Sequence, residues 1–212
     1  MGRSDTDSPQ FSNTRTFTES LSYMTPLWYT ARKKFNQIHP GPEEWKKYCE
    51  WARLPQLREV TGLDSILNGL SFEYDTKDAD LYNYLIIDGG CATDLFNSAS
   101  YVLECVGSVE RFNFLAVTKN PASDCSEMLV EGFIFLGYEL LDKYYGNSAL
   151  TNCGGFDETF LPAELNAYGL LTNFERAMEV HEKLFVNTPS EVHADCNLFA
   201  VWKHQTIGFD HI

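Results

Sequence analysis

The sequence predicts an α+β fold: a mixed, largely antiparallel sheet with helices packed on one face, preceded by an N-terminal helical pair. Three observations support this class. Several segments have apolar residues at helical spacing, whereas others alternate as strands do. The order of the predicted core elements, β-α-β-β-β-α-β, is typical of such a sheet. A chain of 212 residues is also long enough to bury one sizeable core.

Charge is distributed unevenly along the chain. Residues 1–60 hold nine Lys or Arg and seven Asp or Glu, residues 61–212 hold seven and 23, and the net charge is −14. We expect a flexible leader over 1–20, a helical segment over 21–56 and a single α+β domain over 57–212. The negative charge disfavours nucleic-acid binding, and no apolar run approaches the roughly 20 residues of a membrane span. We therefore expect a cytoplasmic protein that binds neither nucleic acid nor membrane.

The N-terminal helical pair is predicted from apolar spacing and from proline positions. Thr25 and Pro26 form a cap followed by a first-turn proline, and a helical stripe comes after them: Trp28, Ala31, Phe35 and Ile38. The run His39-Pro40-Gly41-Pro42 ends this helix. A second helix begins at Pro42, has two acidic residues in its first turn, and buries Trp45, Tyr48, Cys49 and Ala52.

The middle of the chain predicts two strands on either side of a helix. Residues 81–87 have the pattern of a buried strand, which Asp88-Gly89-Gly90 ends. Thr93 is the predicted cap of the helix, whose apolar face consists of Leu95, Phe96, Ala99, Val102, Leu103 and Val106. Residues 111–118 alternate as a strand, and a loop begins at Asn120.

The last third predicts three more strands and one strongly marked helix. Strands are expected over 133–141 and 148–153, with a bend over 145–147. The sequence Thr172-Asn173-Phe174-Glu175 is a capping box, and the apolar face of the helix that follows is Phe174, Ala177, Met178, His181, Leu184 and Phe185. Residues 196–202 alternate as the final strand, with Cys196, Leu198, Ala200 and Trp202 on one side.

One group of residues has the composition of a cysteine-dependent active site. Cys153 ends a predicted strand and precedes two glycines, which let a substrate approach the backbone. His193 would take the proton of the thiol, and Asp195 or Asn152 would hold the imidazole in one tautomer. The alternative is structural: Cys153 packs in the core, the glycines form a turn, and His193 lies at the entry to the last strand.

The same residues permit a zinc site as an alternative. Cys153, His193 and Cys196 offer the thiolate and imidazole ligands that zinc prefers, and Cys91 would be the fourth ligand. Structural zinc sites usually have two closely spaced ligand pairs, which this set lacks, so we expect no metal and no other cofactor. The six cysteines do not have the spacing of a disulfide framework, and we expect free thiols.

Two other segments carry residue types found at ligand sites. The segment from Asp88 to Asp94 joins a strand to a helix, where a phosphate would bind, but it lacks a phosphate-loop motif and its acidic ends repel anions. A capped turn is the better interpretation. A second segment supplies oxygen ligands for calcium without the spacing of an EF-hand: Glu73, Asp75, Asp78 and Asp80. We expect a solvated acidic loop there that contributes to partner binding.

Two functions remain as hypotheses. The first is an acidic binding protein whose carboxylates face a basic protein partner, and its most concrete form is an immunity-type inhibitor that neutralises a basic toxin or enzyme. The second is a hydrolase or acyl transferase that uses the Cys/His pair. We favour the binding protein, because the surplus of acidic residues beyond residue 60 would form one negative face. The oligomeric state does not follow from the sequence.

Overall fold

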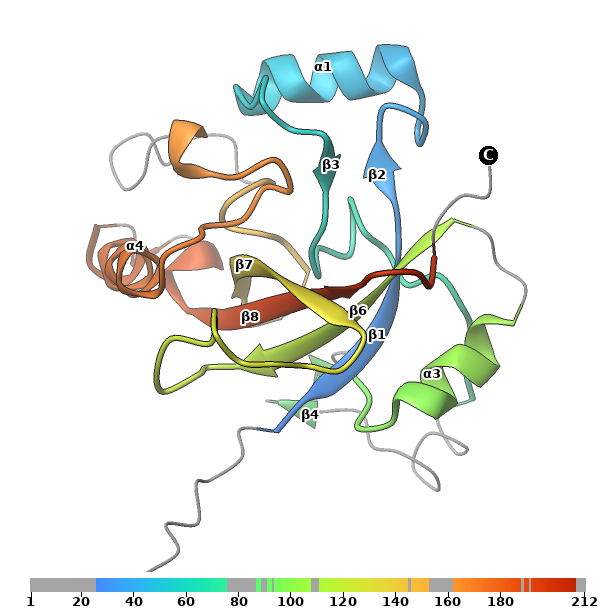
Figure 1. Ribbon diagram of the computed structural model, residues 1–212. Coiled ribbons are helices and arrows are strands. Elements are labelled where there is room, and N and C mark those ends of the chain that lie inside the picture. The colour runs from blue at the N-terminus through green and yellow to red at the C-terminus, as the bar shows by residue number, and fades with distance from the viewer. Residues whose placement is uncertain are drawn as a thin grey trace, which may run out of the picture.

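A four-stranded antiparallel sheet forms the centre of the molecule (Figure 1). The computed structural model describes residues 26–75, 87–88, 91–92, 94–107, 111–144, 146–152, 162–187, 189–190 and 192–208. The sheet has the order β1-β6-β8-β7, with β1 at Trp28–Lys33, β6 at Phe112–Lys119, β8 at Cys196–His204 and β7 at Phe133–Asp142. Helices α3 (Ala99–Val106) and α4 (Phe174–Asn187) accompany it. The predicted α+β class is confirmed.

Strand β1 lies where the first helix of the N-terminal pair was expected, so that helix prediction is wrong. The helical interpretation places Trp28 and Ala31 on one face, but residues three apart in a strand point to opposite faces. Trp28 packs on the cluster that contains Leu115, whereas Ala31 lies in the cluster that contains Phe114. Because both faces of the sheet are covered at β1, apolar residues on both sides imitate helical spacing.

The second predicted helix is confirmed as α1 (Pro42–Ala52), which begins at the expected proline. Trp45 and Tyr48 are buried, and the Tyr48 hydroxyl donates a hydrogen bond to the carbonyl of Thr151 at 2.9 Å. Phe35 packs edge-on against Tyr48, with ring centroids 5.0 Å apart. Phe35 belongs to β2 (Phe35–Asn36), which pairs with β3 (Glu59–Val60), so α1 lies above a small two-stranded sheet at one end of the molecule (Figure 1).

Helices α3 and α4 pack on the same face of the sheet, as predicted. Phe114 of β6 shares a buried cluster with Val102 of α3. Ala116, two residues further along β6 and therefore on the same face, shares a cluster with Val180 of α4. Strand β8 adds the side that its alternation predicts, since Cys196, Leu198, Ala200 and Trp202 all belong to the α4 cluster.

The opposite face of the sheet carries a layer of buried polar side chains under the segment 59–72. Glu59 accepts a hydrogen bond from the Thr61 hydroxyl at 2.8 Å and another from the Asn113 side-chain amide, and it pairs with Lys203 at 3.3 Å. Glu139 of β7, which is 2% exposed, accepts the Leu63 backbone N–H at 2.7 Å. Both carboxyl groups are therefore buried with hydrogen-bond partners, which limits the free-energy cost of removing them from water.

Asp64 joins this polar layer to a distant turn. Its side chain is fully buried, and its Oδ1 accepts the backbone N–H groups of Ile66 at 2.8 Å and Leu67 at 2.7 Å. Its Oδ2 accepts the backbone N–H of Ser148 at 2.8 Å and the side-chain amide of Asn152 at 2.9 Å. One carboxylate therefore satisfies donors from two segments that are far apart in the sequence.

The caps of the two helices differ from the predicted ones. Ser98 caps α3, because its hydroxyl oxygen accepts the Tyr101 N–H at 3.2 Å, and Thr93 lies outside the described residues. Asn173 caps α4, because its Oδ1 accepts the Arg176 N–H at 2.7 Å. Both helices keep a polar oxygen that satisfies a free backbone donor, shifted along the chain from the expected residue.

Residues 148–152 form a turn instead of the strand that was predicted over 148–153. The Ser148 hydroxyl oxygen accepts the backbone N–H groups of Leu150 and Thr151, each at 3.2 Å, which folds this segment locally. The predicted strand over 81–87 is described only from its last residue, in β4 (Ile87–Asp88), which pairs with β5 (Cys91–Ala92). The predicted leader over 1–20 lies outside the described residues.

Candidate functional site

Helix α4 presents three different flanks to its surroundings. A residue advances about 100° around a helix, so Ala177, Val180 and Leu184 share the buried side. The next flank, around the helix, is an apolar stripe with one histidine: Met178, His181 and Phe185. Glu175 and Glu182 border this stripe, while the helix's cations lie on the far flank, where Arg176 pairs with Glu164 at 2.6 Å and Lys183 pairs with Glu179 at 2.6 Å.

The stripe of α4 forms one wall of a hollow of about 470 Å³. Asn120 and Pro121 form a second wall, and the segment 194–198, which leads into β8, forms the third. His181 Nε2 lies 2.8 Å from the Cys196 carbonyl oxygen, and since a carbonyl oxygen only accepts, this nitrogen donates the proton. Asp195 is the one carboxylate, and no Lys or Arg is present, among the described residues that line the hollow.

The loop over 120–132 continues from this hollow and is held firmly to the sheet. The Tyr138 hydroxyl donates to Asp124 at 2.5 Å and accepts the Cys125 N–H at 2.7 Å. Further along the loop, the Trp202 indole donates to the Met128 carbonyl at 3.3 Å. Leu129 follows Met128 and is 97% exposed, and on its other side the Gly132 carbonyl accepts the Gln205 N–H at 2.9 Å. A large apolar side chain is therefore presented to solvent by a loop that is fixed on both sides of it.

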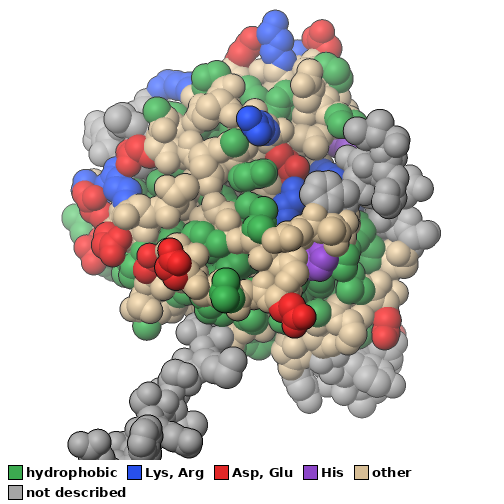
Figure 2. Space-filling view, viewed as in Figure 1, with side chains coloured by type: hydrophobic (Ala, Val, Ile, Leu, Met, Phe, Trp, Pro, Cys, Tyr) green, Lys and Arg blue, Asp and Glu red, His purple; other side chains and the backbone are tan. Residues whose placement is uncertain are grey.

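Acidic side chains occur along the loop, on the flank of α4 and at the hollow. We define the acidic face as Asp124, Glu127, Glu131, Glu175, Glu182 and Asp195. The loop over 120–132 contains three acidic residues and no Lys or Arg. Figure 2 shows several acidic side chains on the side that carries α4, with Lys and Arg side chains beside some of them, and side chains of both signs over α1.

Two more large apolar side chains are exposed on α4. Phe185 is 63% exposed and Val186 is 71% exposed, both at the end of α4. Phe185 lines the hollow and also a neighbouring hollow of about 480 Å³ that contains Lys143 and Asp195. Lys143 pairs with Asp195 at 3.2 Å. Exposed apolar groups within a charged rim are typical of interaction surfaces.

The Tyr138 contact gives a testable consequence for the loop. The hydrogen bond from the Tyr138 hydroxyl, together with those from Ser126, lowers the pKa of Asp124. In Tyr138→Phe, we expect the pKa of Asp124 to rise towards its ordinary value and the Cys125 N–H to lose its acceptor, at a cost of about 1–3 kcal/mol in unfolding free energy. Carboxyl NMR titration and denaturant unfolding measure the two effects. An unchanged Asp124 titration would contradict this account of the anchor.

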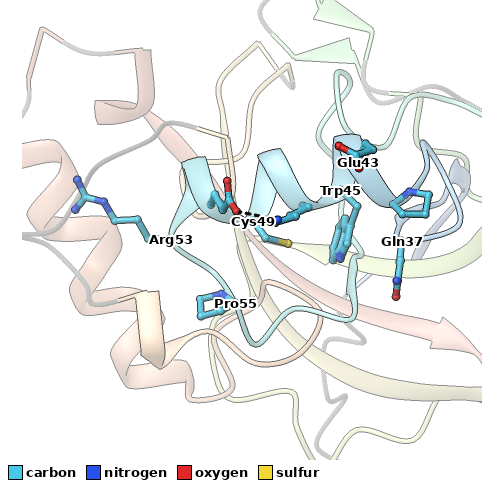
Figure 3. A pocket seen from close by; sticks show the side chains of 9 residues that line it. Gln37, Glu43, Trp45, Cys49, Arg53 and Pro55 are labelled. Carbon is cyan, nitrogen blue, oxygen red and sulfur yellow. Dashed lines mark ion pairs between the residues drawn. The ribbon is translucent and has the colours of Figure 1, made fainter.

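A second concave region lies along α1 and is larger, at about 830 Å³ (Figure 3). Trp45 and Cys49 point from α1 into the space beneath it, with Gln37 and Pro55 towards its two ends, whereas Arg53 extends away. Burial raises the pKa of the Cys49 thiol. The charged residues at its rim have both signs: Glu43, Lys46, Glu50 and Arg53. Lys46 and Glu50 are 3.9 Å apart, so this groove gives no preference for the charge of a ligand.

The residues of the predicted cysteine site have other partners where they are described. Asn152 donates to Asp64 at 2.9 Å, and the Asp195 carboxylate pairs with Lys143. His193 lies in the short helix η2 (Val192–Ala194) and is partly buried. Cys153 lies outside the described residues. The structure therefore places Asn152 in the polar layer and Asp195 at the hollow, and the Cys/His pair stays a prediction.

The predicted acidic loop is not part of the acidic face. Glu73 and Asp75 are exposed, while Asp78 and Asp80 lie outside the described residues. Tyr74, between the first two, packs edge-on against Phe96 in the cluster next to α3. In the described parts of the chain, no three His, Cys, Asp or Glu side chains are grouped so that they could hold a metal ion.

Sequence reasoning did not single out the acidic face. A signal was present in the loop, whose 13 residues include three acidic residues and no Lys or Arg. In α4, the seven-residue interval from Glu175 to Glu182 places both carboxylates on one flank of the helix. Nothing in the sequence indicates that the start of the loop and the apolar stripe of α4 line one hollow.

No family model, no curated protein and no solved structure matches this chain. Among the helices of the described residues, none combines the length and the apolar composition needed to cross a membrane. Function therefore has to be argued from the geometry of the acidic face.

Proposed function

We propose that this chain is a binding protein whose acidic face docks on a basic protein partner. The observation that carries the proposal is the fixed loop over 120–132, which presents Leu129 at 97% exposure among carboxylates and without a cation. A rigid loop loses little conformational entropy on binding. An exposed apolar side chain adds binding free energy when a partner buries it, which solvent-exposed charges do not. Carboxylates around such an anchor speed the encounter with a cation-rich surface.

An immunity-type inhibitor is the concrete form of this proposal. The acidic face would cover the cation-rich active site of a toxin or enzyme, with Leu129 and Phe185 as apolar contacts. A cytoplasmic location belongs to the same proposal, and the thiols of Cys49, Cys105, Cys125 and Cys196, which are free, fit a reducing compartment.

A capture experiment with matched charge variants tests the proposal. The acidic-face variant carries Glu127→Gln, Glu131→Gln and Glu182→Gln, and the control variant carries Glu44→Gln, Glu73→Gln and Glu104→Gln. All six side chains are exposed, and both variants change the net charge equally. Each protein, and the wild type, is immobilised and exposed to a lysate of its native cells.

We expect a basic protein to be retained by the wild type and by the control variant, and to be reduced at least about tenfold on the acidic-face variant. Equal loss from both variants would show that net charge alone causes retention and would contradict the proposed face. Retention of no basic protein by the wild type would also contradict the proposal.

A further inference from the structure

The hollow beside Asp195 has the composition of a subsite for one long cationic side chain. Its lining includes Met178 and Leu198, which suit a chain of methylene groups, and the exposed ring of Phe185. Its volume of about 470 Å³ has room for a single extended side chain. Its described lining residues include no Lys or Arg, and the nearest cation described is Lys143 of the neighbouring hollow, 3.2 Å from Asp195.

Two side chains of the hollow, Asp195 and Asn197, offer oxygen atoms that can accept hydrogen bonds from a cationic group. Asp195 Oδ2 receives Lys143 from the neighbouring hollow, and within the described chain its Oδ1 accepts no hydrogen bond. Asn197 Oδ1 accepts from the Asn120 side-chain amide at 3.0 Å and retains a second lone pair. Glu175 and Glu182 border the α4 wall and add negative potential at the entrance.

We propose that this hollow takes the side chain of one arginine of the basic partner, an inference that rests on the proposed function. The guanidinium plane stacks on Phe185 and donates to Asp195, while its methylene groups lie on Met178 and Leu198. Arginine fits better than lysine, because a planar group with several N–H donors can stack on a ring and still bond to a carboxylate that also holds Lys143.

The test uses a peptide probe and the full chain. Acetyl-Gly-Arg-Gly-amide is titrated into the labelled protein, and the amide resonances of Phe185, Ala194 and Asn197 are followed by NMR. The comparison probe contains citrulline, which has nearly the same shape without the charge. We expect saturable shifts at these residues with the arginine peptide, and binding at least about tenfold weaker with the citrulline peptide.

Two variants and one control locate the probe. We expect Asp195→Asn to weaken arginine binding several-fold through the lost carboxylate, and Phe185→Ala to weaken it through the lost ring; this ring is exposed, so the variant should fold. Glu104→Gln on α3 should bind like the wild type. Equal binding of both peptides, or unchanged binding by both variants, would overturn the arginine subsite.

The two proposals fail in different ways. If Asp195→Asn and Phe185→Ala retain the basic partner in the capture experiment while the acidic-face variant loses it, the arginine subsite is rejected and the proposed function stands. If the acidic-face variant retains the partner while the arginine peptide still binds in the hollow, the docking face is rejected instead.

Discussion

Replacement of Asp64 by alanine is expected to lower the free energy of unfolding by about 4 kcal/mol, because it leaves one buried and two partly buried backbone N–H groups without their acceptor. Each such group costs about 1–3 kcal/mol when it is buried unpaired. The lost carboxylate also releases the side chain of Asn152, which ties the turn after Ser148 to the polar layer. Denaturant unfolding of the two proteins measures the difference.

Asparagine at position 64 separates the effect of shape from the effect of hydrogen bonding. An Asn side chain keeps one oxygen for Ile66 and Leu67, but its amide group then faces the two donors that Oδ2 accepted, from Ser148 and Asn152. We expect Asp64→Asn to be destabilised by about half as much as Asp64→Ala. Glu104→Ala, on the exposed side of α3, should change stability by less than about 0.5 kcal/mol. An Asp64→Ala variant as stable as this control would contradict the assigned role.

Glu139→Gln is expected to gain stability over the wild type as pH rises from 5 to 8. Burial raises the pKa of Glu139 to about 8, and the nearby Asp64 carboxylate also raises it. The Leu63 N–H and the Arg32 guanidinium lower this pKa but do not outweigh burial. The folded protein therefore holds a proton on Glu139 that the unfolded chain, with a pKa near 4.5, releases. Stability that is fully present below pH 4.5 is lost as pH rises towards 8.

Glutamine imitates the protonated acid at every pH, so the variant lacks this loss. Release of one proton on unfolding lowers the unfolding free energy by about 1.4 kcal/mol per pH unit between the two pKa values. We therefore expect the difference in unfolding free energy between variant and wild type to change by about 4 kcal/mol from pH 5 to pH 8. Glu104→Gln is the control, since its carboxylate is exposed. A difference that stays constant with pH would show that Glu139 is ionised in the fold and would reject this description of the layer.

The sequence was most informative where a local signal was clear. The alternation over 111–118 predicted β6 although both faces of that strand are buried, the pattern over 133–141 predicted β7, and proline with acidic residues at the start of a helix predicted α1. It failed at β1, where apolar residues on both covered faces, such as Trp28 and Ala31, stand at helical spacing. It also failed at 148–152, where the side chains of Ser148 and Asp64 satisfy backbone groups that a strand would otherwise pair.

The site was less predictable than the fold, because it depends on contacts between distant segments. Asp195 was singled out as a partner for a histidine, but its carboxylate pairs with Lys143 and faces the hollow. The excess of acidic residues was evident, yet part of it is interior: Asp64, Glu139 and Asp142 are buried and do not contribute to a surface. Only the folded arrangement shows that the start of the loop, at Asn120 and Pro121, and the apolar stripe of α4 line one hollow.

The most direct test of the acidic face is the rate at which the chain associates with its captured basic partner at increasing salt. Charges within a Debye length steer the encounter, so we expect the wild-type association rate to fall at least about tenfold between low and high ionic strength. The variant with Glu127→Gln, Glu131→Gln and Glu182→Gln should start slower and depend less on salt, while the matched control behaves like the wild type. An association rate that does not respond to ionic strength, or that responds equally in both variants, would contradict docking through this face.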